Sequence, residues 1–160
     1  MHVPEARIEE TGAGPVYVRR ARRVVAVVGP DGIAVGPHAV WVANSQDGTV
    51  VRIDPVTYTV SGPIFVGAGP AGIAVTSAAV WVANSLDLTV SRLDPATGRV
   101  TATVGVGDGP GAIAAASDGV WVVDQFDATL RRIDPRTNQV SLIVSVGSSP
   151  QAIAAAGSGV

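Results

Sequence analysis

The residue types that most often perform acid–base chemistry are scarce in this sequence. It has two histidines, His2 and His38, and its three glutamates all lie within the first ten residues: Glu5, Glu9 and Glu10. General acid–base catalysis needs a titratable pair within hydrogen-bond reach, and His38 has no acidic candidate in its own loop. The chain has no cysteine, which excludes thiol catalysis, disulfides and zinc–cysteine sites. The sequence therefore indicates no catalytic residues.

The best candidates for a metal site are Asp124 and Asp127, because they are two carboxylates three residues apart in one hairpin. Calcium takes roughly six to eight oxygen ligands, so two carboxylates are too few by themselves. Asn44 and Asn84 occupy places equivalent to Asp124, and short polar side chains often close a hairpin by bonding to backbone. We interpret these residues as hairpin-closing, and we predict no metal site and no cofactor.

A repeat of forty residues organises the elements that carry these side chains. Trp41, Trp81 and Trp121 are forty residues apart, and so are three Asp-Pro-x-Thr segments that begin at Asp54, Asp94 and Asp134. The segment GIAVGPHAVWVANSQDGTVVRIDPVT returns twice with small changes, and a fourth unit begins at Gln151. Tandem units of this length are typical of repeat architectures.

Each unit predicts four short strands. In the first unit they span 32–35, 40–44, 49–54 and roughly 59–66, with β-branched residues inside and Gly, Pro, Asn, Asp and Ser between them. No segment has a sustained helical period. Four strands in about forty residues, repeated in tandem, predict an all-β protein with the blades of a β-propeller. The small residues of each first strand, such as Ile33–Val35, suit strands that converge near the propeller axis, and a further such strand is expected at 153–156.

The predicted domain organisation is a partial propeller. Residues 1–23 are an N-terminal extension or a degenerate half-blade, with a fourth strand expected at 24–28, and the propeller occupies 24–160. Three complete blades, 31–70, 71–110 and 111–150, precede the start of another at 151–160.

The units GP-x-GIAV, VWVANS, TVSRLDPATGRV and VGVG resemble the YVTN-type bacterial β-propeller repeats, and they are similar to the repeats of the streptogramin (virginiamycin B) lyase family. The resemblance covers residues 24–160 and implies the propeller fold. It also implies, for a lyase, histidine and glutamate from neighbouring blades together with magnesium. No residue of this chain occupies a matching catalytic position, because the residues after each Trp are Val-Ala-Asn or Val-Val-Asp.

The repeat separates structural positions from candidate binding positions. Residues that recur in every unit serve the fold, which assigns a structural role to the Trp, Arg52/Arg92/Arg132 and Asp54/Asp94/Asp134 sets.

Loops on a rigid scaffold commonly carry recognition, and the blade-to-blade connections and the hairpins between second and third strands open on one face of a propeller. The variable positions there form the candidate binding set: Asp31, Gln46, Leu86, Leu88, Phe126 and Gln151. Neutral drift is the alternative explanation of their variation.

The charge and hydropathy of the sequence indicate which classes of partner are not expected. The formal net charge is −2, so the Arg19–Arg23 segment, with four arginines, is interpreted as a solvated flank and no nucleic-acid partner is expected. No apolar run approaches the roughly 18 residues of a membrane helix, and the N-terminus has no signal-peptide pattern. We expect a soluble protein with no membrane partner. Its compartment is not predicted, although the resembled family is often extracytoplasmic.

The apolar ends of the repeat array predict association. One face of the first complete blade (Val40, Val42, Val50) and one of the last (Trp121, Val122, Leu130) are expected to be partly uncovered, and terminal repeats normally need polar caps. The chain is therefore expected either to form a homo-oligomer or to belong to a longer chain. The favoured function is a non-catalytic module that binds a ligand or protein. The alternatives are part of a lyase-like enzyme whose catalytic blades lie elsewhere, and a purely structural module.

Overall fold

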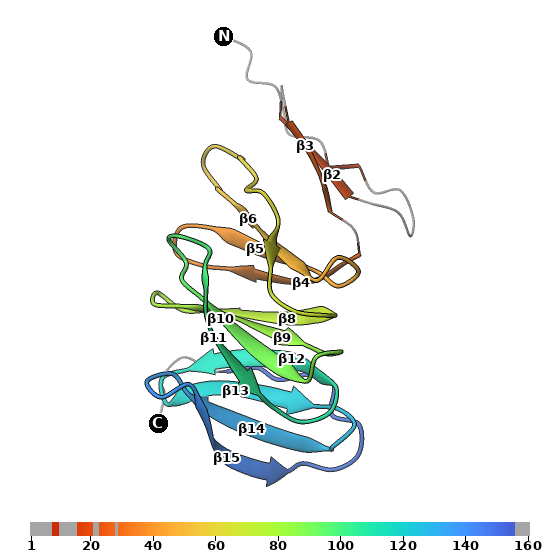
Figure 1. Ribbon diagram of the computed structural model, residues 1–160, viewed down its shortest axis with the longest axis vertical. Helices are drawn as coiled ribbons and strands as arrows, with labels where there is room; N and C mark the ends of the chain where they lie inside the picture. Colours follow the sequence, from red (N-terminus) through yellow and green to blue (C-terminus); the bar gives the residue numbers. More distant parts are fainter. Residues whose placement is uncertain (1–7, 10–15, 21–22, 28, 156–160) are drawn as a thin grey trace.

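The computed structural model describes the backbone of residues 8–9, 16–20, 23–27 and 29–155, and the side chains of 29–155. The described residues form antiparallel strands joined by turns and contain no helix, so no helix long and apolar enough to cross a membrane occurs among them. Four sheets follow one another along the chain (Figure 1). This confirms the all-β prediction.

Three of the four sheets are the predicted blades. Each has four strands paired in sequence order, so each is a simple meander. The first blade comprises β4 (Pro30–Val35), β5 (Val40–Asn44), β6 (Thr49–Ile53) and β7 (Ile64–Phe65). The second comprises β8 (Pro70–Val75), β9 (Val80–Asn84), β10 (Thr89–Leu93) and β11 (Val100–Gly105). The third comprises β12 (Pro110–Ala116), β13 (Gly119–Asp124), β14 (Thr129–Asp134) and β15 (Gln139–Ser145).

The fourth sheet precedes the blades. It has three antiparallel strands in the order β1 (Ile8–Glu9), β2 (Val16–Arg20) and β3 (Arg23–Val27). Part of the strand expected at 24–28 is therefore present in β3, while residue 28 lies outside the described residues.

Two strand predictions need correction. The fourth strand of the first blade was expected at 59–66, but it is reduced to β7 and an isolated bridge between Ile53 and Val60. Gly62-Pro63 interrupts it, because proline has no N–H to donate to the ladder; the equivalent residues of β11 are Ala102 and Thr103. The strand expected at 153–156 is absent from its described part, 153–155, and no described strand lies beside it to supply ladder hydrogen bonds.

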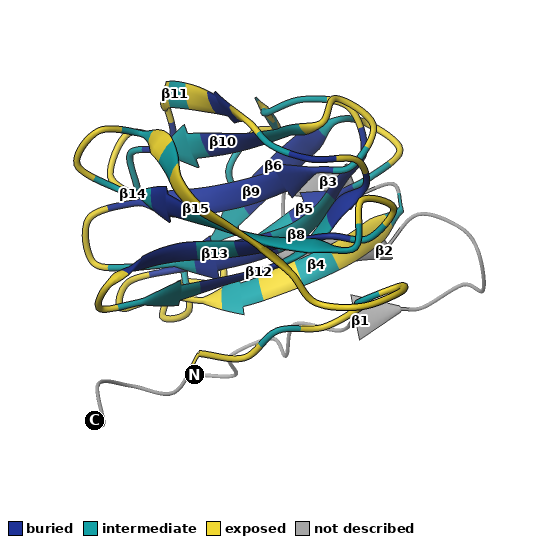
Figure 2. Cartoon of the chain, turned by 90° about the horizontal axis from the view of Figure 1, so that it is seen from below, coloured by how far each residue is buried: buried dark blue, intermediate teal, exposed yellow. Residues whose placement is uncertain are grey.

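The core lies between adjacent blades rather than within one blade (Figure 2). Trp41, Ala43 and Val50 of the first blade pack against Ile73, Val80 and Val82 of the second. The second blade repeats this on its other face, where Trp81, Ala83 and Val90 pack against Ile113, Val120 and Val122. Every residue of β9 is consequently buried, because the second blade is covered on both sides.

This arrangement corrects part of the prediction of which residues are uncovered on the first and last blades. Val50 and Val122 both face the second blade and are fully buried. On the first blade, the exposed side chains of the outward face are Ile33 and Val35, at 68% and 77% exposure. The counterparts of Ile33, which are Ile73 and Ile113, are buried against a preceding blade, so Ile33 and Val35 lie on the face that packs against a neighbour in the other two blades.

Candidate functional site

The hairpins between second and third strands meet the blade-to-blade connections at one end of the blades, as predicted. The backbone N–H of Ala68 donates to Asp87 Oδ2 at 2.7 Å, and the N–H of Asp108 donates to Asp127 Oδ2 at 3.0 Å. Ser85 Oγ donates to the Gly69 carbonyl at 2.8 Å. We call this end, formed by hairpins 44–49, 84–89 and 124–129 with connections 66–70 and 106–110, the loop face.

The hydrogen bonds refine the prediction that Asn and Asp close their own hairpins. The aspartates at the hairpin ends instead bind the connection that lies beside them, nineteen residues away in sequence for both Asp87 and Asp127. Asn84 does both, because its amide donates to the carbonyl of Val66 at 3.2 Å and to Thr89 Oγ1 of its own hairpin at 3.1 Å. These bonds link each hairpin to the connection beside it.

The tip residue of each hairpin rests on a glycine of the neighbouring connection. A Cβ atom at Gly29, Gly69 or Gly109 would lie 2.5–2.7 Å from the side chains of Gln46, Leu86 and Phe126 respectively. Each of these glycines has φ near +65°, a left-handed conformation that side chains rarely adopt. Although they contact the glycines, Leu86 and Phe126 remain 74% and 73% exposed.

A groove of about 340 Å³ lies between the first and second blades on this face. It is lined by residues 45–48 and 67–69, which include Gln46, and by Phe65 and Leu86. Two of the six candidate residues, Gln46 and Leu86, thus come together. Phe65, which is 77% exposed, was missed because it lies in the fourth strand. Its counterparts Gly105 and Ser145 differ from it, and the same comparison between repeats could have found it.

The other four candidate residues lie apart from this groove. Phe126 caps the next hairpin, and Leu88 occupies a turn position with φ of 58°. Asp31 is exposed near the start of β4, and Gln151 is exposed after β15 in a described segment without strand structure.

The two carboxylates considered for a metal are occupied by an arginine. Arg131 Nε lies 2.9 Å from Asp124 Oδ2, and Arg131 Nη2 lies 3.2 Å from Asp127 Oδ2. Burial raises the pKa of Asp124 above its ordinary value, although Arg131 and the Thr129 hydroxyl oppose this shift. Among residues 29–155, no group of three or more His, Cys, Asp or Glu is placed to hold a metal ion.

Comparison with known proteins bears on the fold. No family model matches the chain, and no curated protein matches its sequence. Three solved structures superpose well: a hydrazine synthase from Kuenenia stuttgartiensis (TM-score 0.74, 24% identity), a streptogramin B lyase (0.71, 18%) and the computationally designed Ika8 protein (0.71, 16%). The matches cover 78%, 88% and 95% of this chain.

The fold is a partial β-propeller. The chain spans 38%, 52% and 50% of the length of these three propeller structures, in the same order. With identities below 25%, these likenesses establish the architecture and carry no activity across.

The opposite end of the propeller blades, which we call the turn end, carries the Asp-Pro-x-Thr turns. Asp54 Oδ1 accepts hydrogen bonds from the N–H groups of Val56 and Thr57 at 2.8 and 2.9 Å, and Asp94 repeats this pattern. These bonds lower the pKa of both carboxyls, with the bond from the threonine N–H as the largest cause. The structural role predicted for these aspartates is confirmed.

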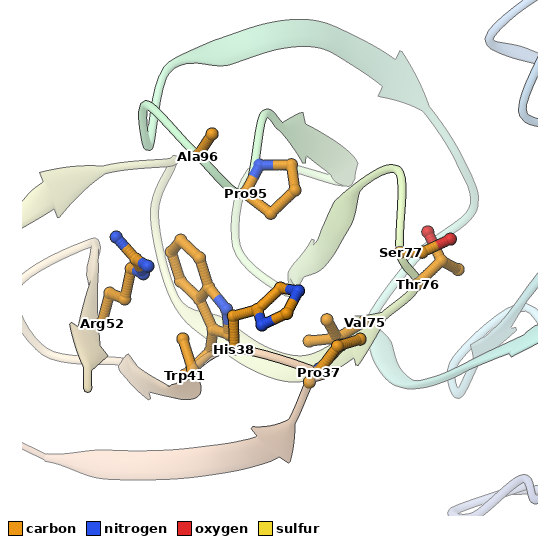
Figure 3. A pocket seen from close by; sticks show the side chains of 11 residues that line it. Pro37, His38, Trp41, Arg52, Val75, Thr76, Ser77, Pro95 and Ala96 are labelled. Atoms are coloured by element: carbon orange, nitrogen blue, oxygen red, sulfur yellow. The ribbon is translucent and has the colours of Figure 1, made fainter. Parts of the chain in front are cut away.

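A pocket of about 340 Å³ opens at the turn end between the first and second blades (Figure 3). Its lining includes His38, Trp41 and Arg52 of the first blade and Thr76, Ser77 and Pro95 of the second. The indole of Trp41 lies between Arg52 and His38 in this view. We call it the Trp41 pocket. The sequence did not predict this pocket, because Trp41 and Arg52 recur in every repeat and were therefore expected to serve the fold.

Proposed function

We propose that this partial propeller is a non-catalytic binding module that recognises a protein segment through its loop face. The observation that carries the proposal is the row of exposed apolar side chains on successive hairpins and strands. Phe65, Leu86 and Phe126 are each more than 70% exposed at the same end of the blades. Apolar side chains gathered on one face of a protein commonly mark an interaction site, and aromatic residues are enriched at such interfaces.

The charge of the loop face specifies the partner further. The hairpins, the connections and the start of β4 carry six aspartates and no Lys, Arg or His. Five of the six are exposed, and two, Asp124 and Asp127, are paired with Arg131 of β14. The six residues are Asp31, Asp47, Asp87, Asp108, Asp124 and Asp127. Complementary charge speeds association and selects partners. A segment that combines apolar side chains with lysine or arginine fits this surface best.

A labelled peptide of alternating leucine and lysine tests the proposal. Fluorescence anisotropy should detect saturable binding to the chain that weakens as salt is raised, since exposed charges are screened. A peptide of alternating leucine and glutamate is the charge control and should bind at least about tenfold more weakly, because the aspartates repel it. Equal binding of the two peptides would overturn the proposed partner.

Substitutions locate the binding face. Leu86→Gln together with Phe126→Gln introduces the glutamine that the first blade already carries at this position, and it should weaken peptide binding about tenfold or more. Val56→Gln is the matched control, because Val56 is 83% exposed but lies in a turn at the opposite end. A loss of affinity in the control as large as that in the double variant would contradict the assignment.

A lyase-like enzyme is the second candidate, favoured by the fold likeness to streptogramin B lyase. Residues 29–155 contain His38 as their one histidine and contain no glutamate. We therefore expect the chain to leave a type B streptogramin unchanged in the presence of magnesium, as measured by chromatography. Conversion that His38→Ala abolishes would support the enzyme instead.

A further inference from the structure

Each blade pairs an arginine with its tryptophan across adjacent strands. Trp81 is directly opposite Arg92, and Trp121 is directly opposite Arg132. The guanidinium carbons lie 5.4 and 5.8 Å from the respective ring centroids, which is within the range of a cation–π contact. Trp41 and Arg52 hold the same register in the first blade.

The second and third blades provide a side-chain oxygen for this arginine. Arg92 Nη1 donates to Asn138 Oδ1 of the next blade at 3.2 Å. Arg132 Nη1 lies 3.6 Å from Asp118 Oδ2 of its own blade, and Asp118 Oδ1 also accepts the indole N–H of Trp121 at 3.2 Å. A guanidinium carries five N–H donors and no acceptor, so partly buried arginines generally retain such a partner.

The first blade lacks both of these oxygens. The residue equivalent to Asn138 is Gly98, and the residue equivalent to Asp118 is His38. The buried Nε of Arg52 has no hydrogen-bond partner within the described part of the chain. Asp54 is the acid whose pKa responds to Arg52, but its Oδ1 already accepts from Val56 and Thr57 in the turn.

A cavity occupies the place next to this arginine. The Trp41 pocket has a volume of about 340 Å³, at the lower end of the usual range for small-molecule sites. Its lining includes the buried indole of Trp41 and is mainly apolar, with Pro37, Val75 and Pro95 among its residues. The pocket therefore combines flat apolar surfaces with a guanidinium whose buried Nε has no hydrogen-bond partner among residues 29–155.

We propose that the Trp41 pocket binds a small aromatic carboxylate. The carboxylate accepts hydrogen bonds from Arg52 and takes the place that Asp118 and Asn138 fill for the other two arginines. Guanidinium and carboxylate match in geometry and can form two parallel hydrogen bonds. The aromatic ring lies among the proline and tryptophan surfaces, where burial of apolar area adds affinity. This site is at the turn end and is independent of the loop face.

Calorimetric titration with benzoate tests the site. Benzoate should bind saturably with one site per chain, and benzamide, which has the same ring but no charge, should bind at least about tenfold more weakly because charge-assisted bonds are stronger. Arg52→Gln should reduce benzoate affinity to a similar degree. Arg92→Gln is the matched control in the second blade, and it should leave the affinity unchanged.

A second variant tests the site by filling it from within. His38→Asp places at the exposed position 38 the residue type that contacts the equivalent arginine, Arg132, from position 118 of the third blade. This variant should fold as the parent does by circular dichroism and should lose benzoate binding, whereas His38→Ala should retain it. Equal affinities for benzoate and benzamide, or undiminished benzoate binding by the folded His38→Asp variant, would overturn the proposal.

Discussion

One residue in each loop-face hairpin has a positive φ, and comparison of the three blades shows where this conformation is strained. Gly48, Leu88 and Ala128 occupy equivalent positions and adopt φ values of 67°, 58° and 53°. Glycine accepts this left-handed conformation without cost, whereas a side chain raises its energy. The first blade therefore has the residue that this turn favours, Gly48, whereas the other two blades have Leu88 and Ala128 in its place.

This comparison predicts that Leu88→Gly stabilises the protein. Relief of strain is partly offset by the greater freedom of glycine in the unfolded chain, and a net gain of about 0.5–1 kcal/mol is expected. Urea denaturation measures it. The reverse change, Gly48→Leu, should be destabilising, because a Cβ there would also lie 2.8 Å from the Gly67 carbonyl oxygen. A lower urea midpoint for Leu88→Gly would contradict the strain argument.

The turn aspartates predict a specific response to acid. The folded pKa of Asp94 is lowered from an ordinary value of 3.8 by hydrogen bonds from the N–H groups of Thr97 and Ala96. A carboxyl with a lowered folded pKa contributes stability above its unfolded pKa, and this contribution is lost as the pH falls through the folded value. Asp94→Asn keeps an oxygen that can accept both bonds but removes the titration.

Asp94→Asn should therefore reduce the loss of stability below about pH 4. Urea midpoints measured from pH 6 down to pH 2.5 give the two profiles to compare. Asp108→Asn is the control, because Asp108 is exposed and its carboxylate accepts no hydrogen bond among the described contacts. Identical acid profiles for the parent and Asp94→Asn would argue against the turn as a source of acid sensitivity.

The three tryptophans should differ in their importance for stability. Trp41 and Trp81 are each 1% exposed between two blades, whereas Trp121 is only partly buried. Truncation of a buried aromatic side chain to alanine typically costs about 3–5 kcal/mol. Trp81→Ala is expected to cost the most, since both faces of its blade are covered, and Trp121→Ala the least. A urea midpoint lower for Trp121→Ala than for Trp81→Ala would contradict this order.

At the scale of the elements, convergence of the inner strands decides which residues fit. A Cβ at Gly32 would lie 2.2 Å from the Ala71 carbonyl oxygen, and one at Gly72 would lie 2.1 Å from that of Gly111. Both contacts are with backbone, which cannot move aside without displacing a strand. The prediction of small residues near the axis is explained by this close approach of β4, β8 and β12.

Gly72→Ala should consequently destabilise the protein by about 1–3 kcal/mol, the usual cost of overpacking. Gly62→Ala is the control, because a Cβ there meets no atom within 4 Å. Thermal or urea melts of the two variants should separate clearly. Similar stability for both would show that the strands of neighbouring blades can move apart.

At the scale of the whole molecule, the outward face of the first blade predicts association. Ile33 and Val35 are exposed in a strand whose counterparts in the next two blades pack against a neighbour. Burial of apolar surface is favourable by about 25 cal/mol per Å². We expect the purified chain to self-associate in light scattering and to bind an apolar dye.

Ile33→Arg together with Val35→Glu should reduce this self-association. Val56→Arg removes an equally exposed apolar side chain from a turn and should leave the association unchanged. A parent chain that scatters as a 16.1 kDa monomer and binds no dye would refute the prediction.

The repeat and the local turns were readable in the sequence because their determinants are close together along the chain. The Asp-Pro-x-Thr segments bond to their own backbone, and alternating small and β-branched residues mark the strands. The loop face could also be predicted, because the repeat places the same loops at the same end of every blade. Fourth strands were less predictable, since Gly62-Pro63 shortened one of them through a local defect in the repeat.

By itself, the sequence determined the all-β blade architecture, the order of the strands within each blade and the residues that recur for structural reasons. Only the tertiary structure decided which of six variable residues share a groove, that Phe65 joins them, and that the buried Nε of Arg52 has no hydrogen-bond partner among residues 29–155. These features depend on contacts between blades about forty residues apart. Their geometry is set by the packing of Trp41 and its neighbours against the next sheet, which no local pattern specifies.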